Sequence, residues 1–253
     1  MNTYKSNKQL KNLSIMQMNG HMGLLIGSTL LQQVITFFAS FLISSMIPTY
    51  TYIGIIINYI VVFIVQILAF VLQAGLYLIY MNTACRIQCT TSTLFDGFRI
   101  HTNKIIKIAA ILASINSVCN IPAEVMFTEI MAIPVNDINT FDELTAYNNA
   151  LTLYIIVSLG CALLYFLLTL SFIPAFYMIW DYPDDDIVTI LKRSISVMKG
   201  NRIRYLLLQL SFIPSILLSF FTCCISLLWV IPLMNIASTN FYLDIMAVRN
   251  KSI

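Results

Sequence analysis

The sequence predicts an all-α fold: a polytopic bundle of six transmembrane helices, with a cytoplasmic amphipathic helix between the fourth and fifth spans. Of the 253 residues, 59% are hydrophobic and 10% are charged, and the mean hydropathy is +0.84. Soluble domains carry about 25% charged residues. The apolar runs are long enough for helical spans of about 20 residues. They lack the strict alternation of barrel strands, so we expect one integral membrane domain over residues 1–253.

The first two spans lie in a long uncharged stretch. Residues 12–85 contain no Lys, Arg, Asp or Glu. We place spans at 22–47 and 53–81, because each supplies more than the roughly 20 apolar residues that a crossing needs. Pro48 breaks the helix between them, and the tyrosines that follow it suit the membrane interface.

The third and fourth spans are expected at 105–131 and 150–180. Each contains a proline, Pro122 or Pro174, at which a helix is prone to bend. The loop between these spans has no basic residue and several acidic ones. The acidic residues around this loop are Glu124, Glu129, Asp137, Asp142 and Glu143.

The last two spans are drawn from a second uncharged stretch, residues 205–243. We divide it into helices at 204–222 and 225–247, with a tight turn at Thr222-Cys223-Cys224, although its length alone does not require two crossings. Six spans place both termini on the same side of the membrane.

The basic residues determine which side that is. All 14 Lys and Arg residues fall in the N-terminal tail, residues 82–107, residues 181–204 or the C-terminal tail. In the six-span arrangement these four segments share one face. Short cytoplasmic loops are enriched in Lys and Arg, so we expect a multi-pass plasma-membrane protein with both termini cytoplasmic.

The cytoplasmic segment after the fourth span has the pattern of a surface helix over 184–199. It begins with three carboxylates, Asp184 to Asp186, which suit the positive end of a helix dipole. Apolar residues then recur at helical spacing, and Gly200 is a typical helix terminator. We expect the apolar stripe to lie in the membrane interface or against the bundle.

This region contains Asp181, Pro183 and Met198-Lys199-Gly200, and Trp229 and Pro232 follow later in the chain. These residues resemble the pattern of an uncharacterised family of integral membrane proteins of Gram-positive bacteria, known only as a domain of unknown function. The resemblance is strongest over 170–245, and Leu94-Phe95-Asp96-Gly97-Phe98 looks like a second landmark. It implies a six-helix bundle in the bacterial plasma membrane and no established activity. The family-like residues are Asp181, Pro183, Arg193, Ser194, Met198, Lys199, Gly200, Ser211, Phe212, Trp229, Pro232, Phe241 and Tyr242.

Polar residues recur at helical spacing within the spans and form a candidate polar interior. One interpretation is a cavity or path between helices; the other is interhelical hydrogen bonding, worth about 0.6 kcal/mol per contact. Glu124 falls near the outer end of its span by the rise of an α-helix. The candidate residues are Gln32, Gln33, Asn58, Gln66, Gln73, Asn116, Asn120 and Glu124.

The sequence lacks the motifs of common enzyme classes. There is no HExxH, GxSxG, Walker or dinucleotide-binding pattern. We therefore expect a protein that is not an enzyme, with no cofactor, no metal and no catalytic residue. The formal charge of +3 is too small to indicate a nucleic-acid partner.

Two functions are compatible with these observations. The first is a non-enzymatic accessory or regulatory membrane component. The alternative is a transporter or export-related component that moves a small molecule or peptide through a polar cavity. In either case the expected partners are the lipid bilayer, anionic headgroups beside the basic cytoplasmic segments, and a membrane protein or a second copy of the chain.

Overall fold

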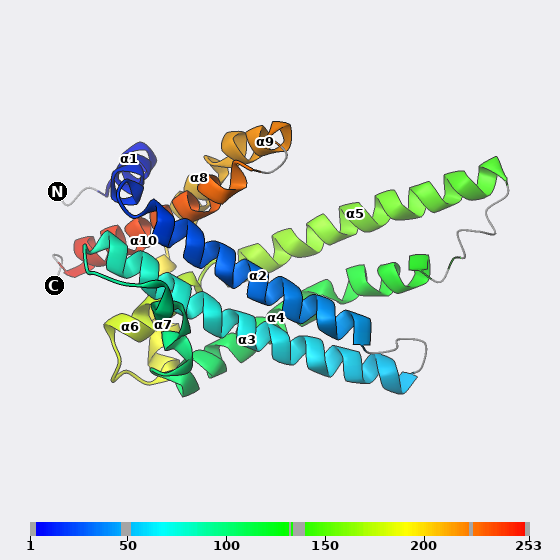
Figure 1. Cartoon of the computed structure of the whole chain (residues 1–253), viewed down its shortest axis with the longest axis horizontal. Helices are drawn as coiled ribbons and strands as arrows, with labels where there is room; N and C mark the ends of the chain where they lie inside the picture. The colour runs from blue at the N-terminus through cyan, green and yellow to red at the C-terminus, as the bar shows by residue number, and fades with distance from the viewer. Residues whose placement is uncertain (1–3, 47–51, 132, 134–139, 223–224, 251–253) are drawn as a thin grey trace. The chain divides into compact units, whose positions relative to one another are not determined.

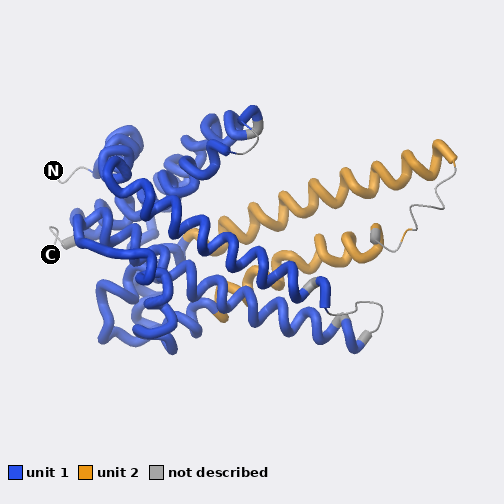
Figure 2. The backbone as a smooth tube through the Cα atoms, in the orientation of Figure 1, with its two compact units in different colours: residues 1–109, 171–253 blue, residues 110–170 orange. Residues whose placement is uncertain are grey.

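The structure is a computed structural model that describes residues 4–46, 52–131, 133, 140–222 and 225–250. Within these ranges the chain is helical and contains no β-strand, which confirms the all-α class. Two compact units can be distinguished, one formed by 1–109 with 171–253 and the other by 110–170 (Figure 2).

Among the described residues, four segments are long and apolar enough to cross a membrane, which supports the expectation of a membrane-embedded protein. They lie in α2 (Met22–Met46), α3 (Tyr52–Ala84), α4 (Thr102–Met131) and the stretch that begins with α5 (Phe141–Thr169). The turn expected at Pro48 lies outside the described residues. In the first unit, α2 and α3 pack side by side (Figure 1).

The segment expected as one helix over 150–180 is divided in two. α5 ends at Thr169, and α6 (Ile173–Asp181) begins with Pro174 in its first turn. Proline lacks an N–H and has a fixed φ, so it is tolerated at a helix start and disrupts a helix interior. The chain therefore starts a new helix at Pro174.

The same kind of break recurs between α8 (Arg202–Leu210) and α9 (Ile213–Phe221), where Pro214 lies in the first turn of α9. α10 (Leu227–Asn250) follows and contains Pro232. Cys223 and Cys224, in the turn expected before it, lie outside the described residues.

Two short helices complete the first unit. α1 (Asn7–Met18) begins with a capping box, in which the Ser6 hydroxyl accepts from the Gln9 N–H and the Gln9 side chain accepts from the Ser6 N–H. α7 (Ile187–Met198) lies against α6 and ends before Gly200, whose φ is +86°. Glycine adopts this left-handed conformation without steric cost, so α7 ends where the sequence predicts.

A 3₁₀ helix, η1 (Thr91–Phe98), packs closely on α3 and contains the Leu94–Phe98 landmark. A Cβ added at Gly75 of α3 would overlap the backbone of Leu94, and one at Gly97 would lie 2.5 Å from the Val71 carbonyl oxygen. The two glycines therefore allow the backbones of η1 and α3 to touch. Leu94 joins a buried core with residues of α1, α2, α3 and α10.

Candidate functional site

The second half of α10 is enclosed by the rest of the first unit. Every residue from Ile236 to Tyr242 is buried, although this stretch contains Ser238, Thr239 and Asn240. Asp244, one turn later, is 7% exposed. Buried polar groups are costly unless they are hydrogen-bonded, so the partners of these side chains define the site.

Ser238 and Thr239 bind neighbouring helices. The Ser238 hydroxyl accepts from the Gln209 amide of α8 at 2.8 Å and lies 3.1 Å from the Tyr205 hydroxyl. The Thr239 hydroxyl lies 3.1 Å from the hydroxyl of Tyr177 in α6. These two residues therefore connect α10 to two helices at once.

Asn240 connects α10 to α1. Its amide donates to the Ser14 hydroxyl at 2.9 Å and to the Gln17 side-chain oxygen at 2.6 Å. The Gln17 amide in turn donates to the Ala84 carbonyl at the end of α3, at 3.2 Å. The side-chain oxygen and the side-chain nitrogen of Gln17 thus both form hydrogen bonds, and these bonds join α1, α3 and α10.

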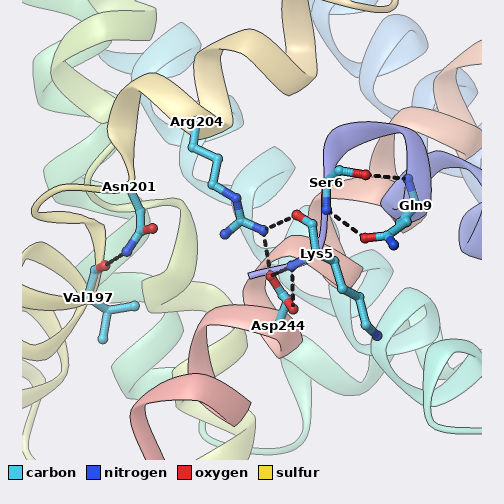
Figure 3. Close-up of polar contacts among 7 residues, drawn as sticks. All are labelled: Lys5, Ser6, Gln9, Val197, Asn201, Arg204 and Asp244. Carbon is cyan, nitrogen blue, oxygen red and sulfur yellow. Dashed lines mark hydrogen bonds and ion pairs between the residues drawn. The ribbon is translucent and has the colours of Figure 1, made fainter. Parts of the chain in front are cut away.

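Asp244 is the centre of an ionic contact (Figure 3). Its carboxylate lies 2.5 Å from the Arg204 guanidinium and accepts from the Lys5 backbone N–H at 3.2 Å. Arg204 also donates to the Lys5 carbonyl at 2.7 Å. Its guanidinium lies over the rings of Tyr4 and Phe241, 4.6 and 4.9 Å from their centroids. We call Asp244, Arg204 and the Lys5 backbone the Asp244 clamp.

Tyr242 faces α6. Its hydroxyl donates to the exposed carboxylate of Asp181 at 2.5 Å, and its ring stacks on Tyr177 with centroids 4.9 Å apart. The family-like residues Asp181 and Tyr242, 61 positions apart, are therefore brought into contact. This contact holds α10 against α6, and the Asp244 clamp holds α10 against α8 and the Lys5 backbone.

A repeated pentapeptide marks the two helix breaks, and our sequence reasoning missed it. Leu-Ser-Phe-Ile-Pro occurs at 170–174 and again at 210–214. At each break a side chain donates to the serine carbonyl: the Ser194 hydroxyl to Ser171 at 2.7 Å, and the Lys11 ammonium to Ser211 at 2.6 Å. The Lys11 ammonium also lies 4.1 Å from the Phe212 ring centroid, and burial lowers the pKa of Lys11. A search for internal repeats would have found this signal.

The other family-like residues have local structural roles. Arg193 forms an ion pair with Asp185 at 2.6 Å and lies over the Tyr182 ring. Met198 and Pro232 are buried, whereas Pro183, Lys199 and Trp229 are exposed. The Asn201 amide donates to the Val197 carbonyl, which caps α7 beside Gly200 (Figure 3).

The candidate polar interior is divided between the two units. In the first unit Gln32 is buried, Asn58, Gln66 and Gln73 are half-buried, and Gln33 is exposed. In the second unit the Asn120 amide donates to the Asn116 side-chain oxygen at 2.8 Å, and Glu124 is exposed. The structure brings together only Asn116 and Asn120 by a hydrogen bond among the described members of this set.

The arrangement around α10 is suited to holding helices together. Serine, threonine, asparagine and tyrosine side chains of α1, α6, α8 and α10 donate to and accept from one another. The carboxylates of Asp181 and Asp244 are engaged by Tyr242 and Arg204. We call α1, α6, α8 and α10, joined in this way, the α10 module.

Comparison with known proteins bears on the family. The profile of the family described as "Protein of unknown function (DUF975)" matches residues 1–249. A search of curated proteins found no match, and a search of solved structures found none either. Because the match covers nearly the whole chain, the protein belongs to the DUF975 family of proteins of unknown function.

Proposed function

We propose that the protein is a non-enzymatic accessory or regulatory component of the bacterial plasma membrane, crossing it six times with both termini in the cytoplasm. One observation supports this most directly. The polar and ionic side chains around α10 are bonded to one another, and those bonds join four helices. Such a site is suited to keeping the four helices in one arrangement, to which a partner protein binds.

Exposed apolar surface supports six crossings. Beyond the four apolar segments, α9 exposes Leu217, Leu218 and Phe221, and the start of α10 exposes Leu228 and Trp229. Contiguous apolar surface of this kind is favourable in lipid and costly in water. α8 with α9, and then α10, would form the fifth and sixth crossings.

The charge pattern supports the orientation and the surface position of α7. Lys192, Lys199 and Arg202 are exposed on or beside α7, where they can attract anionic headgroups. Arg193 and Arg204 instead form ion pairs with Asp185 and Asp244. The apolar stripe of α7 packs inward through Ile190, Val197 and Met198.

The accessory function is tested by purification from native membranes. The tagged chain is extracted in two mild detergents, and retained proteins are identified and quantified by mass spectrometry. An accessory component is expected to retain a membrane protein, or a second copy of itself, in a fixed ratio in both detergents. Recovery as a monomer without a partner in both would contradict the proposal.

Transport is the second candidate, and one observation favours it. The side-chain oxygens of Gln32, Asn58 and Gln66 are buried in α2 and α3 and have no hydrogen-bond partner among the described residues. An unpaired acceptor inside a membrane span raises the free energy of the folded state. Polar residues retained in spans despite this cost often mark a functional path. A row of such amides could bind a polar solute on its way across the membrane.

Gln66→Leu distinguishes the two candidates, with exposed Gln33→Leu as its control. Removing a buried unpaired acceptor is neutral or stabilising by about 1 kcal/mol when the residue has no solute to bind. An accessory role therefore predicts unchanged complementation of a deletion strain and an equal or higher melting temperature. Lost complementation by Gln66→Leu alone, with the protein still folded, would support transport.

A further inference from the structure

A pocket of about 350 Å³ lies in the first unit between α1 and the end of α3. Polar side chains from three segments line it: Gln17 and Asn19 at the end of α1, His21 before α2, and Arg86 and Gln88 after α3. Its remaining walls are mostly apolar. We call this the Arg86 pocket.

The Arg86 pocket lies at the depth of lipid headgroups. The apolar segment of α2 begins at Met22, directly after His21, and that of α3 ends at Ala84, two residues before Arg86. Two membrane-spanning segments therefore reach the membrane surface at this pocket. The interfacial region at such helix ends contains the phosphates of the lipids.

The polar lining favours an anion. No acidic residue lines the pocket, and no carboxylate in the described part of the chain forms an ion pair with Arg86. A guanidinium is a planar group of donors that matches a phosphate. His21, Asn19 and Gln88 add side chains that can donate hydrogen bonds.

The backbone holds Arg86 in an unusual conformation. Its φ is +59°, in the left-handed region that residues other than glycine seldom adopt. The Arg86 N–H donates to the Thr83 carbonyl at 3.1 Å, and the Ile87 N–H donates to Asn82 at 2.8 Å. This turn reverses the chain directly after α3 and keeps Arg86 in the wall of the pocket.

The apolar lining distinguishes a lipid from a soluble anion. Met16 and Ile87 line the pocket and are 70% and 57% exposed. A free phosphate would gain nothing from these side chains, whereas the glycerol and acyl portion of a phospholipid would cover them. An amphipathic molecule with an anionic group and an apolar portion would therefore contact the cation, the amides and the exposed apolar side chains together.

We infer that the Arg86 pocket binds the phosphate of an anionic phospholipid, with Arg86 as its main cationic contact and Met16 and Ile87 against the lipid's apolar portion. The pocket also contains Gln17, which is hydrogen-bonded to Asn240 of α10. A lipid bound here would contact the end of α1, which Gln17 joins to α10 within the α10 module. This inference goes beyond the proposed function, because a lipid site is compatible with either an accessory or a transport role.

The test measures lipid binding to the full chain in a non-ionic detergent by native mass spectrometry, with phosphatidylglycerol as the probe and phosphatidylcholine, a zwitterion without net charge, as the comparison. Arg86→Gln is expected to weaken phosphatidylglycerol binding about fivefold, because it removes the charge-assisted hydrogen bonds of the guanidinium to the lipid phosphate. His21→Gln is expected to weaken it less. Arg99→Gln removes an exposed arginine outside the pocket and is expected to leave binding within about twofold of the original.

Two results would overturn the inference. Equal losses from Arg86→Gln and Arg99→Gln, with both variants folded by circular dichroism, would mean that the lipid responds to the general positive charge of this face. Glycerol 3-phosphate binding as tightly as the lipid, together with unchanged lipid binding by Ile87→Ser, would assign the pocket to a soluble phosphate ester.

Discussion

The carboxylate of Asp244 lies 2.5 Å from the guanidinium of Arg204, 40 residues earlier in the chain. The side chains are 6% and 19% exposed, so water screens the pair less than it would a surface pair. Because the Lys5 backbone binds both groups, the contact fixes the start of α1 against α8 and α10.

Removing either Asp244 or Arg204 should destabilise the fold. Asp244→Ala leaves a largely buried guanidinium without its carboxylate, and breaking such pairs costs about 3 kcal/mol. Arg204→Ala should cost a similar amount, because it leaves the Asp244 carboxylate, which is 6% exposed, with only the Lys5 N–H as a donor. Titration with sodium dodecyl sulphate from mixed micelles gives the free energy of unfolding of each variant.

The matched control is Arg202→Ala, which removes an exposed arginine from the same helix and should change stability by less than about 0.5 kcal/mol. Equal destabilisation by Arg202→Ala and Asp244→Ala would show that the Asp244 clamp has no special role.

The contact between η1 and α3 predicts strong intolerance of side chains at Gly75. Gly75→Ala places a Cβ on the Leu94 backbone, which cannot move without displacing η1. Overpacking of this kind costs about 1–3 kcal/mol or more. Gly27→Ala in α2, where nothing lies within 4 Å of the added Cβ, should be tolerated. Equal melting temperatures for the two variants would refute the close backbone contact.

The helix break at Ser171 depends on a single donor. Ser194→Ala removes the hydroxyl that binds the Ser171 carbonyl and leaves that buried acceptor unpaired, which costs about 1–3 kcal/mol. Ser196→Ala, on the exposed side of α7, should cost almost nothing. Thermal unfolding compares the two variants, and a Ser194→Ala protein as stable as Ser196→Ala would contradict this role.

The thiols after α3 should react slowly near neutral pH. Burial raises the pKa of Cys85 and Cys89, and the nearby Asp181 carboxylate raises that of Cys85 further. Since the thiolate is the nucleophile, alkylation of both thiols at neutral pH should be slower than that of a free cysteine and should accelerate as the pH rises.

Asp181→Asn separates the two causes. It should lower the pKa of Cys85 and speed alkylation of Cys85 at pH 8, and it should leave Cys89 unchanged. Peptide mass spectrometry after timed alkylation measures both rates. An unchanged Cys85 rate would show that the carboxylate has no influence on this thiol.

The all-α class and the apolar segments could be predicted from the sequence because they depend on composition and run length. Residues 12–85, for example, lack any charge, and α2 and α3 lie within them. A bend at Pro174 was predicted, but the start of a separate helix, α6, at Ile173 was not.

The α10 module could not be predicted, because its contacts join distant parts of the chain. Asp244 binds the backbone of Lys5, 239 residues away, and Asn240 binds Ser14, 226 residues away. The sequence places Arg204 in a basic segment that is expected to set the orientation of the chain. The partner of Arg204 lies on another helix, and no local pattern distinguishes a paired arginine from a solvated one.

The orientation of the basic face is the central claim, and labelling of single cysteines in intact cells tests it most directly. Thr145→Cys in α5 and Ser196→Cys in α7, both exposed positions, are placed in a background without native cysteines. We predict that a membrane-impermeant maleimide labels Thr145→Cys on intact cells and Ser196→Cys only after the membrane is opened. Labelling of Ser196→Cys alone on intact cells would contradict the account.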